Sequence, residues 1–299
     1  MLIRYAILAA ASLAALLASP ATAETKVKVV ATFSILGDLV KNVGGDRIEL
    51  AILVGPNGDA HVYAPSPADA KKIADAKVVF VNGLGLEGWM TRLVKASGTK
   101  APAVVASKGI KPRKMEDEHK PGHLVIDPHA WQSIANAKSY VANIREGLIK
   151  ADPAGKPDYE ANASVYLAKL DALEREVKAV MSKIPADHRR IITTHDAFGY
   201  FSDAYGIEFI SPEGVSTESE ASAQDVAKII AQIKKQKIPA VFMENISDPR
   251  LMEQIAKETG AKIGGTLYSD ALSDEKGPAA TYIDMMRSNL RALSAALTS

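Results

Sequence analysis

Cysteine is absent from all 299 residues of the chain. This absence excludes disulfide bonds, cysteine-bound zinc, iron–sulfur clusters and thiol nucleophiles. Neither positive nor negative residues are in clear excess. The chain has 36 Lys and Arg residues and 35 Asp and Glu residues, which give a formal net charge of +1. Nucleic-acid binding is therefore not expected, because such proteins carry a clear basic surplus. Any transition-metal site in this chain must use His, Asp and Glu.

Long apolar runs are also missing, apart from a short one at the start. Residues 1–23 contain Arg4, an apolar run from Tyr5 to Leu17, and the small-x-small tripeptide Ala21-Thr22-Ala23. The run is too short to span a membrane and is typical of a cleaved export signal. We therefore expect a periplasmic protein. Because no cysteine is available for lipidation, we also expect it to have no lipid anchor.

The rest of the sequence alternates short apolar strands with amphipathic helices. Helix starts are marked by Ser66-Pro67-Ala68-Asp69 and Ser222-Ala223-Gln224-Asp225, which have the residues of helix N-caps. Nearly continuous apolar runs are typical of strands covered on both faces of a parallel sheet. The predicted strands are Lys26–Thr32, Ile48–Val54, Lys77–Asn82, Ala103–Val105, His123–Ile126, Arg190–Thr194, Ile207–Ser211, Ala240–Glu244 and Lys262–Leu267. The pattern predicts two small α/β domains with parallel sheets.

One segment between the two halves differs from its surroundings. Residues 158–184 contain no Gly or Pro, and apolar residues recur there at helical spacing. A helix of this length spans roughly 40 Å, which favours a connecting helix packed along both domains over a coiled-coil helix. The predicted organisation is therefore a signal peptide at 1–23, an N-terminal domain at 24–156, a linking helix at 157–185 and a C-terminal domain at 186–299.

Four candidate metal ligands follow predicted strands at matching places. His61 follows Ile48–Val54 across a turn, and His129 follows His123–Ile126. His195 follows Arg190–Thr194 and is expected to precede a helix over 196–205, and Asp270 follows Lys262–Leu267. In open parallel α/β sheets, ligands bind beyond the carboxyl ends of the strands. Two candidates therefore point from each half toward a shared cleft.

The four residue types suit a divalent transition metal. Imidazole and carboxylate are good ligands for first-row divalent ions, and three His with one Asp complete a tetrahedron. A single His after a strand is more often a hydrogen-bonded loop residue, so the shared position carries the hypothesis. Binding is expected to weaken as the pH falls through about 6.5, because imidazole must be neutral to bind a metal.

The chain resembles the periplasmic zinc- and manganese-binding proteins of ABC transporters, the family of the zinc-uptake and treponemal metal-binding proteins. The resemblance spans nearly the whole chain beyond the signal. It is carried by Val30-Ala31-Thr32-Phe33-Ser34-Ile35-Leu36-Gly37-Asp38, Gly58-Asp59-Ala60-His61-Val62-Tyr63-Ala64-Pro65-Ser66-Pro67, Val81-Asn82-Gly83-Leu84-Gly85-Leu86-Glu87, Asp127-Pro128-His129-Ala130-Trp131, Thr194-His195-Asp196-Ala197-Phe198-Gly199-Tyr200-Phe201 and Tyr268-Ser269-Asp270.

The resemblance implies two α/β domains joined by one long rigid helix, with a metal site in the cleft between them. Its ligands carry over onto His61, His129, His195 and Asp270. It implies a solute-binding protein that delivers a divalent metal to an ABC-type permease in the inner membrane. A monomer is expected. A periplasmic metal chaperone is a further candidate partner.

One region departs from the pattern of many zinc-uptake members, which carry a long His- and acid-rich loop. Here residues 115–123 hold only two His, His119 and His123, and three acids. We interpret them as a solvated polar loop, with metal collection or docking of a metal-delivering partner as the alternative. Candidates for orienting the ligand imidazoles are Asp59, Asp127, Asp196 and Glu244, although a capping or turn role is favoured for Asp196.

Zinc is the favoured metal because a site rich in nitrogen suits it, while manganese prefers more oxygen. Manganese or iron uptake by the same kind of protein is the alternative. A zinc metallohydrolase is less favoured, since four protein ligands leave no position for water and Glu244 is the only candidate base. A metal-binding adhesin is also possible for this family, but no sequence feature supports it. The protein is therefore expected not to be an enzyme.

Overall fold

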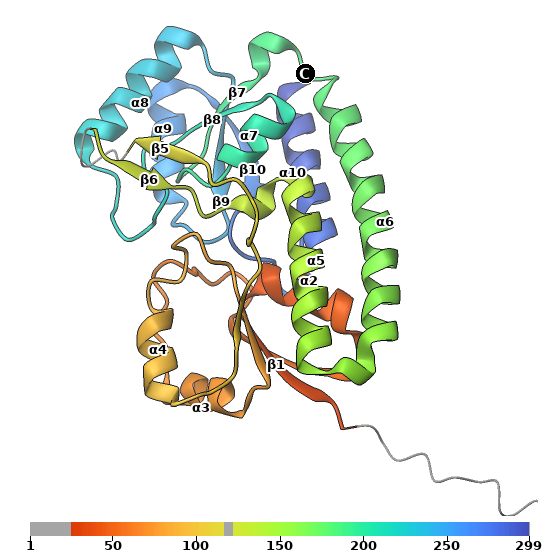
Figure 1. Cartoon of the computed structure of the whole chain (residues 1–299). Helices are drawn as coiled ribbons and strands as arrows, with labels where there is room; N and C mark the ends of the chain where they lie inside the picture. Colours follow the sequence, from red (N-terminus) through yellow and green to blue (C-terminus); the bar gives the residue numbers. More distant parts are fainter. Residues whose placement is uncertain (1–24, 117–121, 299) are drawn as a thin grey trace, which may run out of the picture.

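The computed structural model describes residues 25–116 and 122–298 (Figure 1). The predicted export signal and His119 lie outside these described residues. Within them, the strands form two four-stranded parallel sheets and one two-stranded antiparallel hairpin. The predicted α/β fold with two parallel sheets is confirmed.

The first sheet has the strand order β2-β1-β3-β4, and the second has the order β10-β9-β7-β8. The strands of the first sheet are β1 (Val27–Phe33), β2 (Ile48–Val54), β3 (Val78–Val81) and β4 (Ala103–Val105). Those of the second are β7 (Arg190–Ile192), β8 (Glu208–Ile210), β9 (Ala240–Glu244) and β10 (Lys262–Leu267). The hairpin consists of β5 (Lys114–Glu116) and β6 (Leu124–Ile126).

The α-helices lie between and beside these strands. They are α2 (Ser34–Gly44), α3 (Pro67–Asp75), α4 (Met90–Ser97), α5 (Ile134–Ala151), α6 (Lys156–Met181), α7 (Gly199–Tyr205), α8 (Ala223–Gln236), α9 (Arg250–Thr259) and α10 (Tyr282–Leu297). The predicted caps are present. The Ser66 side chain accepts a hydrogen bond from the Asp69 backbone at the start of α3, and Ser222 does the same for Asp225 at the start of α8.

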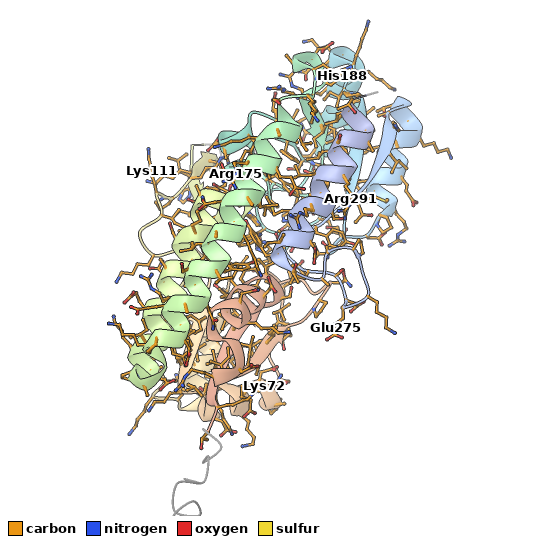
Figure 2. The ribbon with its side chains drawn as sticks, turned by 90° about the vertical axis from the view of Figure 1, so that its right-hand side faces the viewer. Lys72, Lys111, Arg175, His188, Glu275 and Arg291 are labelled. Carbon is orange, nitrogen blue, oxygen red and sulfur yellow. The ribbon has the colours of Figure 1, made fainter. Side chains whose placement is uncertain are left out.

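The long helix α6 runs beside both sheets, as the sequence predicts (Figure 1). It packs against α2 and α5 of the first half and against α7 and α10 of the second. Figure 2 shows α6 and α10 next to each other on one face of the molecule. The buried residues of α6, including Tyr159, Tyr166 and Leu173, belong to one apolar core that also contains residues of β1, β9 and α10.

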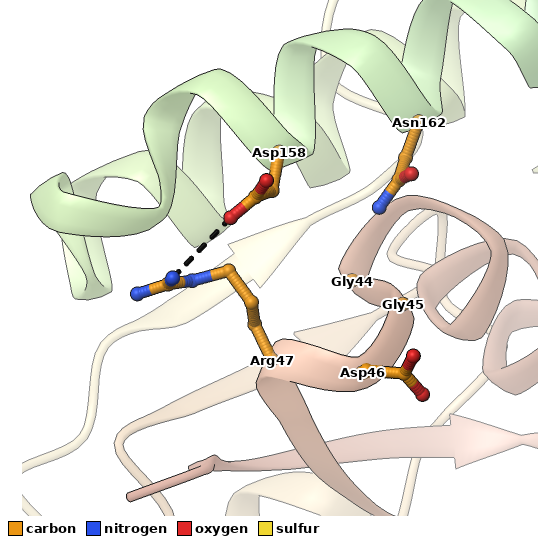
Figure 3. A pocket seen from close by; sticks show the side chains of 6 residues that line it. All are labelled: Gly44, Gly45, Asp46, Arg47, Asp158 and Asn162. Atoms are coloured by element: carbon orange, nitrogen blue, oxygen red, sulfur yellow. Dashed lines mark hydrogen bonds and ion pairs between the residues drawn. The ribbon is translucent and has the colours of Figure 1, made fainter. Parts of the chain in front are cut away.

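The first turns of α6 are fixed to the first half by polar contacts (Figure 3). The Arg47 guanidinium lies 3.2 Å from Asp158, and Asn162 donates a hydrogen bond of 3.1 Å to the Val43 carbonyl. Gly45 has a φ of 56°, and a Cβ at this position would collide with the Asn162 amide. A glycine is therefore required where α2 ends against α6.

Two predictions about local structure are wrong. The strand before His129 does not join a parallel sheet, because β6 pairs antiparallel with β5, which was not predicted. The helix after His195 begins at Gly199 rather than at Asp196, because residues 195–198 turn away from the end of β7 before the helix forms. Within residues 25–116 and 122–298, no helix combines the length and apolarity that crossing a membrane requires.

Candidate metal centre

The structure brings all four predicted ligands together. One ligand atom from each of His61, His129, His195 and Asp270 lies within 4.8 Å of every other. His195 and Asp270 follow β7 and β10 of the second sheet, and His61 lies in the loop between β2 and α3. His129 follows the hairpin strand β6 and immediately precedes a short 3-10 helix, Ala130–Gln132.

The Asp270 carboxylate lies at the centre of the cluster. Its Oδ2 atom is 3.1 Å from His61 Nε2, 3.5 Å from His129 Nε2 and 3.2 Å from His195 Nε2. The Nε2 atoms of His61 and His129 are 3.1 Å apart. Three nitrogen atoms and a carboxylate oxygen converging in this way match the donor set of a transition-metal site.

Burial of the cluster is almost complete. His129, His195 and Asp270 have 0% of their surface exposed, whereas His61 has 7%. The second carboxylate oxygen of Asp270, Oδ1, is buried and has no hydrogen-bond partner among the described residues. An unpaired buried carboxylate oxygen is costly. A divalent cation in this cluster would supply the missing partner, so the residues present fit a metal.

Two of the three imidazoles have a carboxylate next to the Nδ1 atom, on the side of the ring away from Asp270. The Nδ1 atom of His129 lies 2.9 Å from Asp127 Oδ1, and the Nδ1 atom of His195 lies 2.6 Å from Glu244 Oε2. Such contacts fix the tautomer, because an Nδ1–H that donates to a carboxylate leaves Nε2 free to bind a metal. Glu244 also accepts hydrogen bonds of 2.9 Å from the backbone N–H groups of Thr194 and His195.

His61 is held differently. Asp59 accepts a hydrogen bond of 2.8 Å from the backbone N–H of His61 and does not contact its ring. Among the described residues, no hydrogen bond reaches the Nδ1 atom of His61. Asp196, the remaining candidate for orienting an imidazole, makes no hydrogen bond to a ligand in the described part of the chain. Its backbone N–H donates to the Gly214 carbonyl, as expected for a turn residue.

A further residue near His129 was missed by the sequence analysis. The Arg113 guanidinium lies 3.4 Å from Asp127 Oδ2, on the side of the carboxylate opposite His129. Gly199 makes room for this pair, because a Cβ there would collide with both side chains. Arg113 precedes an unpredicted strand, so no local sequence pattern pointed to it. Trp131, two residues after His129, is buried and donates a hydrogen bond of 3.0 Å to the Ser269 carbonyl, beside Asp270.

The charges of the cluster shift its protonation equilibria. Burial alone lowers the pKa of His129, but the negative charges of Asp270 and Asp127 outweigh burial and raise this pKa to about 9. In the same way, Glu244 and Asp270 overcome burial and raise the pKa of His195. Burial raises the pKa of Asp270, but the two imidazoles prevail and hold it well below its usual range. Without metal, the centre therefore retains protons at neutral pH.

Residues 29–296 match the family described as zinc-uptake complex component A, periplasmic. The iron-binding protein YfeA of Yersinia pestis is 36% identical over 268 residues, which cover 90% of this chain and 85% of YfeA. The manganese ABC transporter substrate-binding lipoprotein PsaA of Streptococcus anginosus is 35% identical over 284 residues, which cover 93% and 91%. The periplasmic zinc-binding protein TroA of Treponema pallidum superposes with a TM-score of 0.85 at 32% identity, covering 92% of this chain and 100% of TroA.

The chain therefore belongs to the ZnuA family of substrate-binding proteins of metal ABC transporters, and the predicted resemblance is confirmed. Its function is to bind a metal for such a transporter, which implies a permease in the membrane as partner. The relatives are named for iron, manganese and zinc, so the comparisons leave open which of these metals this chain binds.

The prediction of a protein without a lipid anchor is contradicted by the relatives. Seven of them are named as lipoproteins, a class that is attached to lipid. The prediction took the absence of cysteine as evidence against any anchor, whereas it bears only on attachment through a cysteine of the given sequence. A periplasmic or extracellular location fits the family.

Proposed function

We propose that the protein binds one divalent transition metal, zinc in preference to manganese or iron, through His61, His129, His195 and Asp270, and delivers it to the permease. The observation that carries this proposal is the position of Asp270. Its Oδ2 atom lies within 3.5 Å of three imidazole nitrogens, and its buried Oδ1 atom has no partner among the described residues. A cation at the centre satisfies both the nitrogen atoms and the carboxylate.

Zinc is supported by the nature of the ligands. Three imidazoles and one carboxylate form a nitrogen-rich set that suits tetrahedral zinc, whereas manganese favours oxygen ligands and higher coordination. A second oxygen from Asp270 would allow a larger coordination number. Manganese therefore remains the alternative, with iron beside it.

We further propose that the chain is not an enzyme. A catalytic zinc usually keeps one position for water and has a general base nearby. Here four protein ligands surround the proposed metal position. Glu244, the only candidate base, is already engaged with His195 and two backbone N–H groups. These contacts favour transport of the metal over metal-assisted hydrolysis.

The remaining parts of the proposal concern organisation and partners. The protein acts as a monomer without nucleic acid, and a metal chaperone is a candidate donor of the ion. Residues 24–156 and 186–299 form its two domains, and residues 157–185 link them. The two parallel sheets and the course of α6 support this division.

Elemental analysis of the protein purified without added metal tests the choice of metal, and titration calorimetry with Zn²⁺ and Mn²⁺ tests the site. We expect one zinc ion per chain and tighter binding of Zn²⁺ than of Mn²⁺. Variants His129→Ala and Lys138→Ala form a matched pair, since Lys138 lies on α5 and pairs with Asp171 away from the cluster. Metal binding by His129→Ala at the wild-type level would refute the ligand assignment, and hydrolysis of a substrate panel would refute the transport-only role.

A further inference from the structure

His61 is the one proposed ligand whose ring lacks a supporting carboxylate among the described residues. It is also the only one of the four with any exposed surface, at 7% against 0%. Its position therefore depends on the loop that carries it, between the end of β2 at Val54 and the start of α3 at Pro67. Contacts that hold this loop in place therefore also hold His61 in place.

The His61 loop is bonded to the second half of the chain at two points. On one side, the Asn57 backbone N–H donates to the Leu272 carbonyl at 2.9 Å, and the Asn245 amide donates to the Asn57 side chain at 3.1 Å. On the other side, the Thr217 hydroxyl donates to Asp59 Oδ2 at 2.6 Å. The other oxygen of Asp59 accepts the backbone N–H of His61. A single carboxylate thus joins Thr217 to the ligand backbone.

Thr217 lies in the connection between β8 and α8, and this connection is itself tied to the strand end that carries His195. The Glu213 N–H donates to the Thr194 carbonyl at 3.3 Å, and the Asp196 N–H donates to the Gly214 carbonyl at 3.1 Å. Hydrogen bonds at residues 213 and 214, the backbone from there to Thr217, and the Thr217–Asp59 hydrogen bond therefore connect the His195 side of the cluster to the His61 loop.

The same contact borders an open pocket of about 460 Å³. Asp59 and Thr217 both line this pocket, together with Glu213 and Glu220. Among the four proposed ligands, only His61 has exposed surface. Asp59 stands two residues before His61, so the pocket lies beside the His61 loop, and the Thr217–Asp59 hydrogen bond lies at its edge.

We propose that Thr217 is a positioning residue for metal retention: through Asp59 it holds the His61 loop closed over the ion, and breaking this bond lets the ion leave past His61. The inference rests on the proposed function, because it requires His61 to be a ligand. Thr217 itself does not touch the metal. Its loss is expected to act on the rate of dissociation more than on the rate of association, since most changes in affinity among variants of one site arise in dissociation.

The test measures the dissociation of Zn²⁺ from the loaded full-length protein by stopped flow with a chelator in excess. Thr217→Val removes the hydroxyl and keeps the branched shape, and we expect dissociation roughly tenfold faster, the size of a lost hydrogen bond to a carboxylate. Thr217→Ser keeps the hydroxyl and should release Zn²⁺ at the wild-type rate. Ser216→Ala removes the neighbouring hydroxyl, which contacts only its own loop, and should also match the wild type.

Two further variants separate the inference from the proposed function. In an Asp59→Ala background, Thr217→Val should accelerate release no further, because the proposed coupling runs through Asp59. Additive effects of the two substitutions, or a wild-type release rate in Thr217→Val, would overturn the inference alone. His61→Ala tests the ligand itself, and wild-type zinc binding in that variant would overturn the proposed ligand set. Melting of the metal-free Thr217→Val protein should match the wild type, whereas a lowered midpoint would assign the residue a structural role.

Discussion

His129 and His195 differ from His61 in how the protein holds them. The first two are fully buried, and each has a carboxylate 2.9 Å or less from its Nδ1 atom. His61 is held through its backbone and through contacts of its loop with the opposite half. In the proposed function, this difference divides the centre into a more firmly held part, formed by His129, His195 and Asp270, and a less firmly held part, formed by His61. A carrier needs both, because it must bind its ion tightly and still release it.

The largest effects are expected from removing ligands, and they should follow this division. His129→Ala and His195→Ala should each weaken zinc binding by about 100-fold or more, because each also leaves a buried carboxylate without its imidazole partner. His61→Ala should cost about tenfold, since no carboxylate is left unpaired. Titration calorimetry or competition with a chelator measures the three affinities. Equal losses in all three variants would contradict the division.

The pH dependence of binding sharpens the comparison. A ligand imidazole must be neutral, and the pKa of His129 is raised to about 9, with that of His195 raised as well. Protons therefore compete with the metal throughout the neutral range, so affinity should rise with pH and level off above about 9. The gain should be about tenfold per pH unit for each proton displaced. This window lies above the value of about 6.5 expected from the sequence.

Competition titrations with Zn²⁺ at several pH values measure this slope. Asp270→Asn provides the contrast, because it removes a charge that contributes to raising both pKa values and should make the dependence shallower. His61→Ala should retain the wild-type slope. An affinity that stays constant between pH 7 and pH 9 in the wild-type protein would show that the imidazoles are already neutral there.

Removing the supporting carboxylates should have the next largest effect. Glu244→Gln and Asp127→Asn should each weaken zinc binding by about 10- to 100-fold, because the amide no longer favours the tautomer with a free Nε2. Asp59→Asn keeps an acceptor for the His61 backbone and should lose less. Affinities measured beside melting midpoints of the metal-free proteins distinguish lost orientation from lost folding. A larger loss for Asp59→Asn than for Glu244→Gln would reverse the proposed order.

The smallest predicted effect concerns metal choice. Exchanging His195 for Glu trades nitrogen for oxygen, but it would also place a carboxylate against Glu244, which lies 2.6 Å from the present imidazole. The double variant His195→Glu/Glu244→Gln removes this repulsion. Its zinc-to-manganese affinity ratio should fall by at least tenfold, or about 1.4 kcal/mol. Titration with both metals checks the ratio, with Glu244→Gln as the control, and an unchanged ratio would remove His195 from metal selection.

The fold and the four-residue cluster were largely predictable because apolar strands and strand ends leave local patterns. Ile48–Val54, Ala240–Glu244 and Lys262–Leu267 have the bounds given by their apolar runs. The argument from parallel strand ends placed His195 and Asp270 correctly. For His129 the predicted position in the cluster is right, but the predicted parallel strand before it is wrong. That strand, β6, belongs to an antiparallel hairpin whose partner strand has only three residues.

What the sequence did not show depends on contacts between distant segments. Thr217 and Asp59 are 158 positions apart, and the loop of Thr217 has neither periodicity nor a capping pattern. Arg113 reaches Asp127 only because the β5–β6 hairpin brings its two ends together. Polar contacts of this kind are set by the tertiary fold, so they leave no spacing in the sequence that could reveal them.

The apolar core described for α6 has a consequence for how the molecule unfolds. It is continuous from β1 and α2, through α6, to β9, β10 and α10, so residues of both sheets share one core. The two halves should therefore lose most of their structure in one cooperative step, although a second, smaller cluster packs residues of β7 and β9 against α8 and α9. Free energy gained from binding an ion at the cleft is then shared by the whole chain. A loaded carrier resists heat and proteolysis even in segments far from its cargo.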